Sequence, residues 1–241
     1  MRKNSILLLL ICLSCIPGKL SAQDKFGFEI GGFGGVAFWK ARNFTIGPPQ
    51  AEPPISLQLK YDDKVFGGVR FNLLSRGHWG GEFSYGYQKN KVTLTRQDAA
   101  LEPVSLDGSV QQFFYNTIFY IFRYDRSPVM PFVTGGIGLE AYGLSDKARA
   151  FARDPEQGGI GELKGIDNRF AFNYGVGIKA KLASHFGVRV DFRHIFSDVP
   201  SYGLPKESPN PTQTILPAQG KLQNYEASVG IYYHVSSRLG N

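Results

Sequence analysis

Residues 186–193 read Phe-Gly-Val-Arg-Val-Asp-Phe-Arg, so apolar and charged side chains alternate along this stretch. Its apolar side chains occupy the even positions, and Arg189, Asp191 and Arg193 occupy odd ones. Successive side chains of a β-strand point to opposite faces of the sheet. The stretch therefore predicts a strand with one apolar face and one charged face.

The same two-residue period recurs along most of the chain. The other alternating segments are residues 26–38, 65–73, 79–87, 131–142, 170–182 and 223–235. Residues 112–122 are apolar on both parities, and Gln112 and Asn116 indicate which side is polar. Counting this segment gives eight strands. A helical pattern competes only at residues 146–153, and no apolar run of about 18 residues follows the N-terminus to form a transmembrane helix.

The predicted connections alternate between short and long. The short ones cover residues 75–78, 123–128 and 183–185, and the long ones cover 40–63, 88–109, 146–168 and 197–221. Eleven of the 14 prolines lie in the long connections, which supports the strand assignments because proline cannot donate to a sheet ladder. Tight turns at one end and long loops at the other are typical of an outer-membrane barrel. We therefore predict an all-β fold, an eight-stranded antiparallel up-and-down transmembrane β-barrel.

Charged residues within the strands bear on which face points outward. All ten fall on the less apolar parity of their own strand: Glu29, Arg70, Glu82, Glu140, Lys179, Lys181, Arg189, Asp191, Arg193 and Glu226. We call these ten residues the lumen network. They fit the polar interior of a membrane barrel, and they would also fit the solvent face of a soluble barrel such as a lipocalin. The one-sided long loops and an N-terminal export signal favour the membrane.

An eight-stranded barrel encloses a space that side chains just fill. Five acids and five bases pointing into it should form buried ion pairs, because an isolated buried charge is costly. We expect Arg189 and Arg193 to meet acids such as Glu82, Glu140 or Glu226. Such a filled lumen disfavours a general diffusion pore.

Residues 1–22 have the features of an export signal. Arg2 and Lys3 precede an apolar run over residues 6–16, and Ser21 and Ala22 offer small side chains for cleavage. We expect residues 1–22 to be the signal peptide and residues 23–241 to be the outer-membrane β-barrel domain. A buried N-terminal helix is the alternative.

Both cysteines, Cys12 and Cys15, lie inside this predicted signal. The mature chain would then hold no disulfide and no cysteine-based metal site. A lipoprotein with Cys15 lipidated is the other possibility. Cleavage removes three positive charges from the formal net charge of +7, and the remaining +4 gives no case for nucleic-acid binding.

Several strand segments resemble the small outer-membrane β-barrel proteins of the OmpA/OmpX-like type. The resemblance is carried by Gly-Val-Arg-Phe (68–71), Gly-Glu-Phe-Ser-Tyr-Gly-Tyr (81–87), Pro-Phe-Val-Thr-Gly-Gly-Ile-Gly-Leu (131–139) and Val-Arg-Val-Asp-Phe-Arg (188–193). It covers essentially the whole mature chain and implies the fold but no activity. Larger members carry a peptidoglycan-binding domain after the barrel, which we do not expect here.

The last strand resembles the sorting signal that the barrel-assembly machinery reads. Ser228, Gly230, Tyr233 and Val235 occupy the places of its polar, glycine and aromatic or apolar residues. A tail over residues 236–241 departs from members that end on an aromatic residue. The resemblance implies that this machinery is a partner during biogenesis.

Candidate catalytic residues are sparse. His78 and His185 lie at predicted turns, and His234 lies on the lumen parity. Barrel-type lipid A deacylases place a serine two residues after a histidine, whereas Ser197 follows His194 by three, which puts the two on opposite faces. We therefore predict no enzyme, and no catalytic, cofactor-binding or metal-binding residue.

A glycine-rich run covers residues 31–35 and lacks the following helix that phosphate binding requires. We expect close packing in a narrow barrel instead. Among the long connections, residues 146–169 mix five basic and five acidic side chains. A solvated loop is the default interpretation, and contact with lipopolysaccharide phosphates is the alternative.

These observations predict an integral protein of the cell outer membrane of a Gram-negative bacterium. Its expected role is structural or surface interaction through four long extracellular loops. A small or gated pore is the first alternative, and a lipid-modifying barrel enzyme is the second. Outer-membrane lipid and lipopolysaccharide are the expected partners, nucleic acid is not, and no extracellular ligand is predicted.

Overall fold

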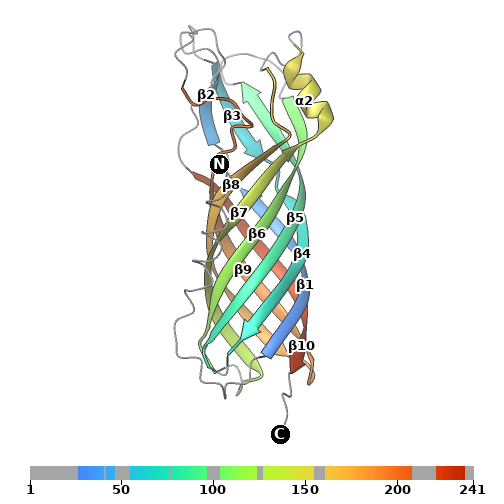
Figure 1. The fold of residues 1–241 in the computed structure, drawn as a ribbon, viewed down its shortest axis with the longest axis vertical. Helices are drawn as coiled ribbons and strands as arrows, with labels where there is room; N and C mark the ends of the chain where they lie inside the picture. Colours follow the sequence, from blue (N-terminus) through green and yellow to red (C-terminus); the bar gives the residue numbers. More distant parts are fainter. Residues whose placement is uncertain are drawn as a thin grey trace, which may run out of the picture.

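The computed structural model describes residues 27–40, 42–46, 55–75, 77–96, 104–123, 127–154, 161–207 and 221–236. The predicted signal peptide and its two cysteines lie outside these residues. Eight long strands form an elongated barrel (Figure 1). They are β1 (Gly27–Trp39), β4 (Lys64–Leu74), β5 (Trp79–Arg96), β6 (Val104–Tyr120), β7 (Val129–Leu144), β8 (Ile166–Lys181), β9 (Phe186–Asp198) and β10 (Lys221–Ser236).

The eight strands close into a ring in which each pairs antiparallel with its sequence neighbour in the barrel. The order around the ring is β1, β4, β5, β6, β7, β8, β9 and β10. The ring closes where β1 pairs with β10, from Gly27 opposite Ser236 to Trp39 opposite Asn224. This confirms the predicted eight-stranded antiparallel up-and-down barrel.

The predicted long connections over residues 40–63 and 88–109 do join barrel strands, but both contain strand, so the prediction that they are loops throughout is wrong. A hairpin of β2 (Arg42–Ile46) and β3 (Ile55–Tyr61) lies within the first, and β3 pairs with the far part of β5. In the second, β5 and β6 stay paired as far as Leu94 opposite Val104. Val92 and Leu106 are buried there. Apolar packing therefore continues beyond Lys64, the first residue of β4, and favours strand over loop.

A short helix, α2 (Asp146–Arg153), begins at Ser145, whose hydroxyl accepts a hydrogen bond from the backbone N–H of Ala148 at 3.2 Å. Ala148 and Ala152 are buried against the barrel end. Residues 146–153, where a helical pattern competed within the predicted loop, thus form a helix. Among the described residues, no helix is long and apolar enough to cross a membrane.

Burial confirms which face of each strand is apolar and outward. On β9, Phe192 is 48% exposed whereas Asp191 is 2% exposed. The glycine run on β1 packs closely, as expected: a Cβ on Gly35 would lie 2.1 Å from the carbonyl oxygen of Ala227 on β10. On β9 the apolar side chains therefore point out of the barrel, and the charged side chains point in.

Candidate functional site: the lumen network and its caps

Five charged side chains from three strands meet in the middle of the lumen. Glu82 accepts from Arg189 at 2.6 Å and from Arg193 at 2.7 Å. Asp191 accepts from Arg70 at 2.7 Å and from two nitrogens of Arg189 at 2.8 and 2.7 Å. All five residues are buried. The expected pairing of Arg189 and Arg193 with Glu82 is thus present, and Asp191 is a further partner.

A second group lies nearer the short turns. Lys179 and Glu29 form an ion pair in which both side chains are fully buried. Asn72 donates to Glu29 at 3.0 Å, and the Lys179 ammonium donates to the Tyr120 hydroxyl at 3.2 Å. Lys181 has the predicted parity but is exposed at the last residue of β8, so it lies at the rim and outside the buried group.

A third group holds two acids without a cation. The side-chain amide of Gln112 donates to Glu140 at 3.0 Å and to Glu226 at 2.7 Å. Among the described residues, neither acid forms an ion pair. Of the three acids named as alternative partners of Arg189 and Arg193, only Glu82 pairs with them in the described residues, and Asp191 is the second acid that engages both guanidinium groups.

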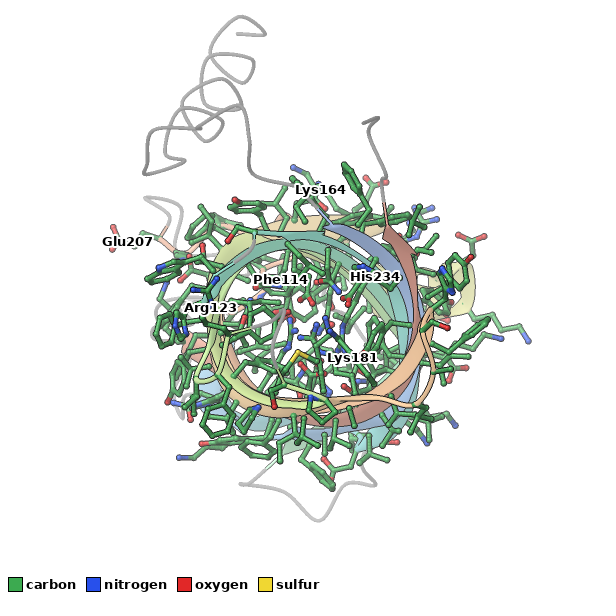
Figure 2. The ribbon with its side chains drawn as sticks, turned by 90° about the horizontal axis from the view of Figure 1, so that it is seen from below. Phe114, Arg123, Lys164, Lys181, Glu207 and His234 are labelled. Carbon is green, nitrogen blue, oxygen red and sulfur yellow. The ribbon has the colours of Figure 1, made fainter. Side chains whose placement is uncertain are left out.

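Side chains fill the interior of the ring (Figure 2), with Phe114 and His234 labelled inside it. A cavity of about 10 Å³ lies beside Arg70, Arg193 and Asn173. This is about the size of one water molecule. At the turn end, the lumen holds an apolar cluster of Leu74, Ile118, Tyr120, Met130 and Phe132.

Aromatic side chains close the opposite end. We call Trp39, Tyr61, Tyr142 and Tyr202 the loop-end cap. The Trp39 and Tyr61 ring centroids lie 5.0 Å apart, and those of Tyr61 and Tyr142 lie 5.6 Å apart. The Tyr61 and Tyr202 hydroxyls are hydrogen-bonded at 2.9 Å. Burial raises the pKa of both hydroxyls above the ordinary tyrosine value, which favours their neutral forms.

The closed ring and its filled interior can be compared with known proteins. Residues 5–235 match the family described as "Outer membrane protein beta-barrel domain". The chain belongs to this outer-membrane β-barrel family. It is an outer-membrane protein of the small-barrel type, as its strand motifs predicted.

One solved structure of an outer-membrane protein shares the fold, and two others are similar over most of the chain with lower TM-scores. OprG from Pseudomonas aeruginosa matches with a TM-score of 0.58 and 15% identity over 89% of this chain and 98% of that chain. The N-terminal β-barrel domain of Pseudomonas aeruginosa OprF matches with a TM-score of 0.43 and 15% identity, over 88% of this chain and 100% of that chain. Neisserial surface protein A has a TM-score of 0.47 and 10% identity, over 86% and 96%. No curated protein matches.

The histidine and serine considered for lipid chemistry lie on opposite faces of the barrel wall, as predicted. His194 faces outward and its Nδ1 contacts the Tyr174 hydroxyl at 3.1 Å. Ser197 is buried inside, where its hydroxyl is hydrogen-bonded to that of Tyr142 at 2.6 Å. Within the described part of the chain, no group of three or more His, Cys, Asp or Glu residues could hold a metal ion.

Three basic residues of the loop over residues 146–169 already have acidic partners. Arg149 pairs with Asp146, Arg153 contacts Glu162 at 3.2 Å, and Arg169 pairs with Asp167. The Arg153–Glu162 pair is exposed and fits the solvated-loop interpretation, whereas the Arg169–Asp167 pair is largely buried and does not.

The four predicted assembly-signal residues lie on β10, the strand that closes the barrel against β1. Ser228 is buried and its hydroxyl accepts from Arg70 at 3.1 Å, so it also joins the lumen contacts. Tyr233 and Val235 are exposed on the outer wall. Recognition of this strand by the assembly machinery remains a prediction.

The loop-end cap was not predicted. Tyr61 and Tyr202 lie in segments that read as long loops, where no alternation marks a buried face. Tyr142 was the one detectable member, because it shares the parity of Glu140 on β7.

Proposed function

We propose that the protein is a closed membrane anchor that presents a structured surface for interactions outside the cell. The observation that carries the proposal is the salt bridge of Glu82 with Arg189, which joins strands on opposite sides of the ring. Together with the turn-end cluster and the loop-end cap, it places buried side chains at three levels of the lumen, which supports a closed barrel. The loops and the outer wall are then the surfaces that remain for partners.

The loop end is itself packed. Asp167 accepts hydrogen bonds from the backbone N–H groups of Ser201 and Tyr202, both at 2.7 Å. The backbone N–H of Lys164 donates to the Tyr202 carbonyl at 2.8 Å. Helix α2 buries its alanines in the same apolar core as the cap. These contacts support a preorganised platform, which loses less conformational entropy when a partner binds.

The alternative function is a small or gated pore. Conductance measurements distinguish such a pore from a closed anchor. The wild-type protein should show no discrete conductance steps in planar lipid bilayers. A variant carrying Glu82→Ala, Arg189→Ala and Arg193→Ala removes the central side chains and serves as the positive control. Regular conductance steps from the wild type would overturn the closed-anchor proposal.

The surface role needs a second measurement. A photo-crosslinking amino acid at Lys147, exposed on α2, should give discrete adducts on intact cells. The same probe at Ser184, exposed in a short turn at the opposite end, is the matched control. Identical adduct patterns from both positions would contradict a role specific to the loop end.

A further inference from the structure

A broad groove of about 730 Å³ lies on the outer wall toward the α2 end of β4 to β8. Ser109 on β6 and Gly143 and Ala141 on β7 are the small residues of its floor: Ser109 faces Gly143, and Ala141 faces the longer Gln111 one row nearer the membrane. Tyr87 and Ile166, both exposed, stand on either side. We call this surface the outer-wall groove. Short side chains in its floor leave room for a ligand between bulkier neighbours.

The groove adjoins a row of exposed apolar side chains on the same strands. Tyr85, Phe113, Leu139 and Phe170 form one row across four strands, and the last three are about half exposed. Lys89 lies four residues beyond Tyr85 on β5, which is about 14 Å along the strand and roughly 10 Å along the membrane normal at the usual tilt. The groove is therefore at the height of lipid headgroups.

Positive charge gathers along this groove. Lys64, Lys89 and Lys91 line it together with one acid, Asp107. Lys91 contacts Asp107 at 3.8 Å and Lys64 contacts Asp62 at 3.7 Å, with all four side chains substantially exposed. Exposed ion pairs at such distances contribute little, so these ammonium groups are available to a stronger anion. A phosphate placed above the small floor would be within reach of flexible lysine side chains.

We infer that the outer-wall groove binds the phosphorylated sugar of lipid A, with its acyl chains along the apolar rows below. The occupant must carry negative charge at headgroup height, a bulky polar body for the hollow, and hydrocarbon for the wall beneath it. Lipid A of the outer leaflet combines all three. The inference goes beyond the proposed function and does not depend on it, because a conducting barrel would have the same outer wall.

Native mass spectrometry of the purified protein in detergent tests the site. The probes are lipid A with both phosphates, dephosphorylated lipid A and phosphatidylglycerol. Phosphorylated lipid A should bind most tightly, and the double variant Lys89→Gln, Lys91→Gln should weaken its binding about tenfold. Lys221→Gln is the control, since Lys221 is exposed at the start of β10 and contacts Asp198 at 2.8 Å. It should leave the affinity unchanged.

A steric variant tests the groove without changing charge. Ala141→Phe should fill the hollow and weaken lipid A binding, while the heat-modifiable gel mobility of a folded barrel is retained. If the lysine double variant does not fold, the Ala141→Phe variant still tests the groove. Equal binding of dephosphorylated lipid A or phosphatidylglycerol would overturn the inference. So would an affinity unaffected by both groove variants.

Discussion

Glu82 on β5 and Arg189 on β9 lie on opposite strands of the eight-stranded ring, and their side chains meet at 2.6 Å. Three strands separate them in either direction around the barrel. Their contact therefore crosses the lumen and joins two walls that share no backbone hydrogen bonds. Arg193 reaches the other oxygen of Glu82 at 2.7 Å, so one carboxylate holds two guanidinium groups.

Removing that carboxylate should be costly. We expect Glu82→Ala to lower the free energy of unfolding by about 3–5 kcal/mol, because two buried arginines lose a partner. The control is Asp62→Ala at the exposed pair with Lys64, which should cost at most about 1 kcal/mol. Urea unfolding in lipid vesicles measures both. Similar losses of unfolding free energy in the two variants would show that the lumen contact stabilises the protein no more than an exposed ion pair does.

Glu226, one of the two acids that share Gln112, should respond to substitution in the opposite direction from Glu82: its replacement should stabilise the protein. Glu226→Gln keeps the side-chain shape and removes a like charge near Glu140, so we expect the unfolding free energy to rise by about 1–3 kcal/mol. Glu29→Gln should lower it, because Lys179 would lose its buried partner. The same unfolding assay at neutral pH compares the two, and a loss in both variants would contradict the like-charge argument.

Val133 and Thr134 test the face assignment with adjacent residues. Val133 is 45% exposed on the outer wall, whereas Thr134 is 6% exposed and donates to the Thr117 carbonyl at 3.1 Å. Val133→Ser should cost about 1–2 kcal/mol through lost apolar contact with lipid. Thr134→Ser keeps its hydroxyl and should be close to neutral. If Thr134→Ser proved clearly worse in lipid vesicles, this strand would face the other way.

Alkaline pH should open the loop-end cap. Burial raises the pKa values of Tyr61 and Tyr202 above the unfolded value of about 10. Their contribution to stability is thus fully present below that pH and is lost as the pH rises above it. Trp39 packs against Tyr61 at a tilt and reports the change in fluorescence once Trp79 is replaced by Phe.

The fluorescence of Trp39 should shift to longer wavelength as the cap opens. The double variant Tyr61→Phe, Tyr202→Phe removes both hydroxyls, so its alkaline shift should be much smaller. An emission maximum that stays constant through the titration range of tyrosine in the parent protein would refute this role of the two hydroxyls.

Alternation, together with the lengths of the connections, determined the eight barrel strands and which residues of a strand share a face. Parity is a property of the local backbone, so Arg189, Asp191 and Arg193 share one face wherever β9 lies. The sequence also determined that the lumen must contain ion pairs, because five acids and five bases share that parity.

Only the tertiary structure decided which charges meet. Ring closure and strand register place Glu82 opposite Arg189 and leave Glu140 and Glu226 together on Gln112, although all three acids have the same parity. Closure also set the height of each residue, which puts Lys181 at the rim and Tyr61 over the lumen end. Register and height depend on pairings between residues far apart in the chain, and no local pattern specifies them.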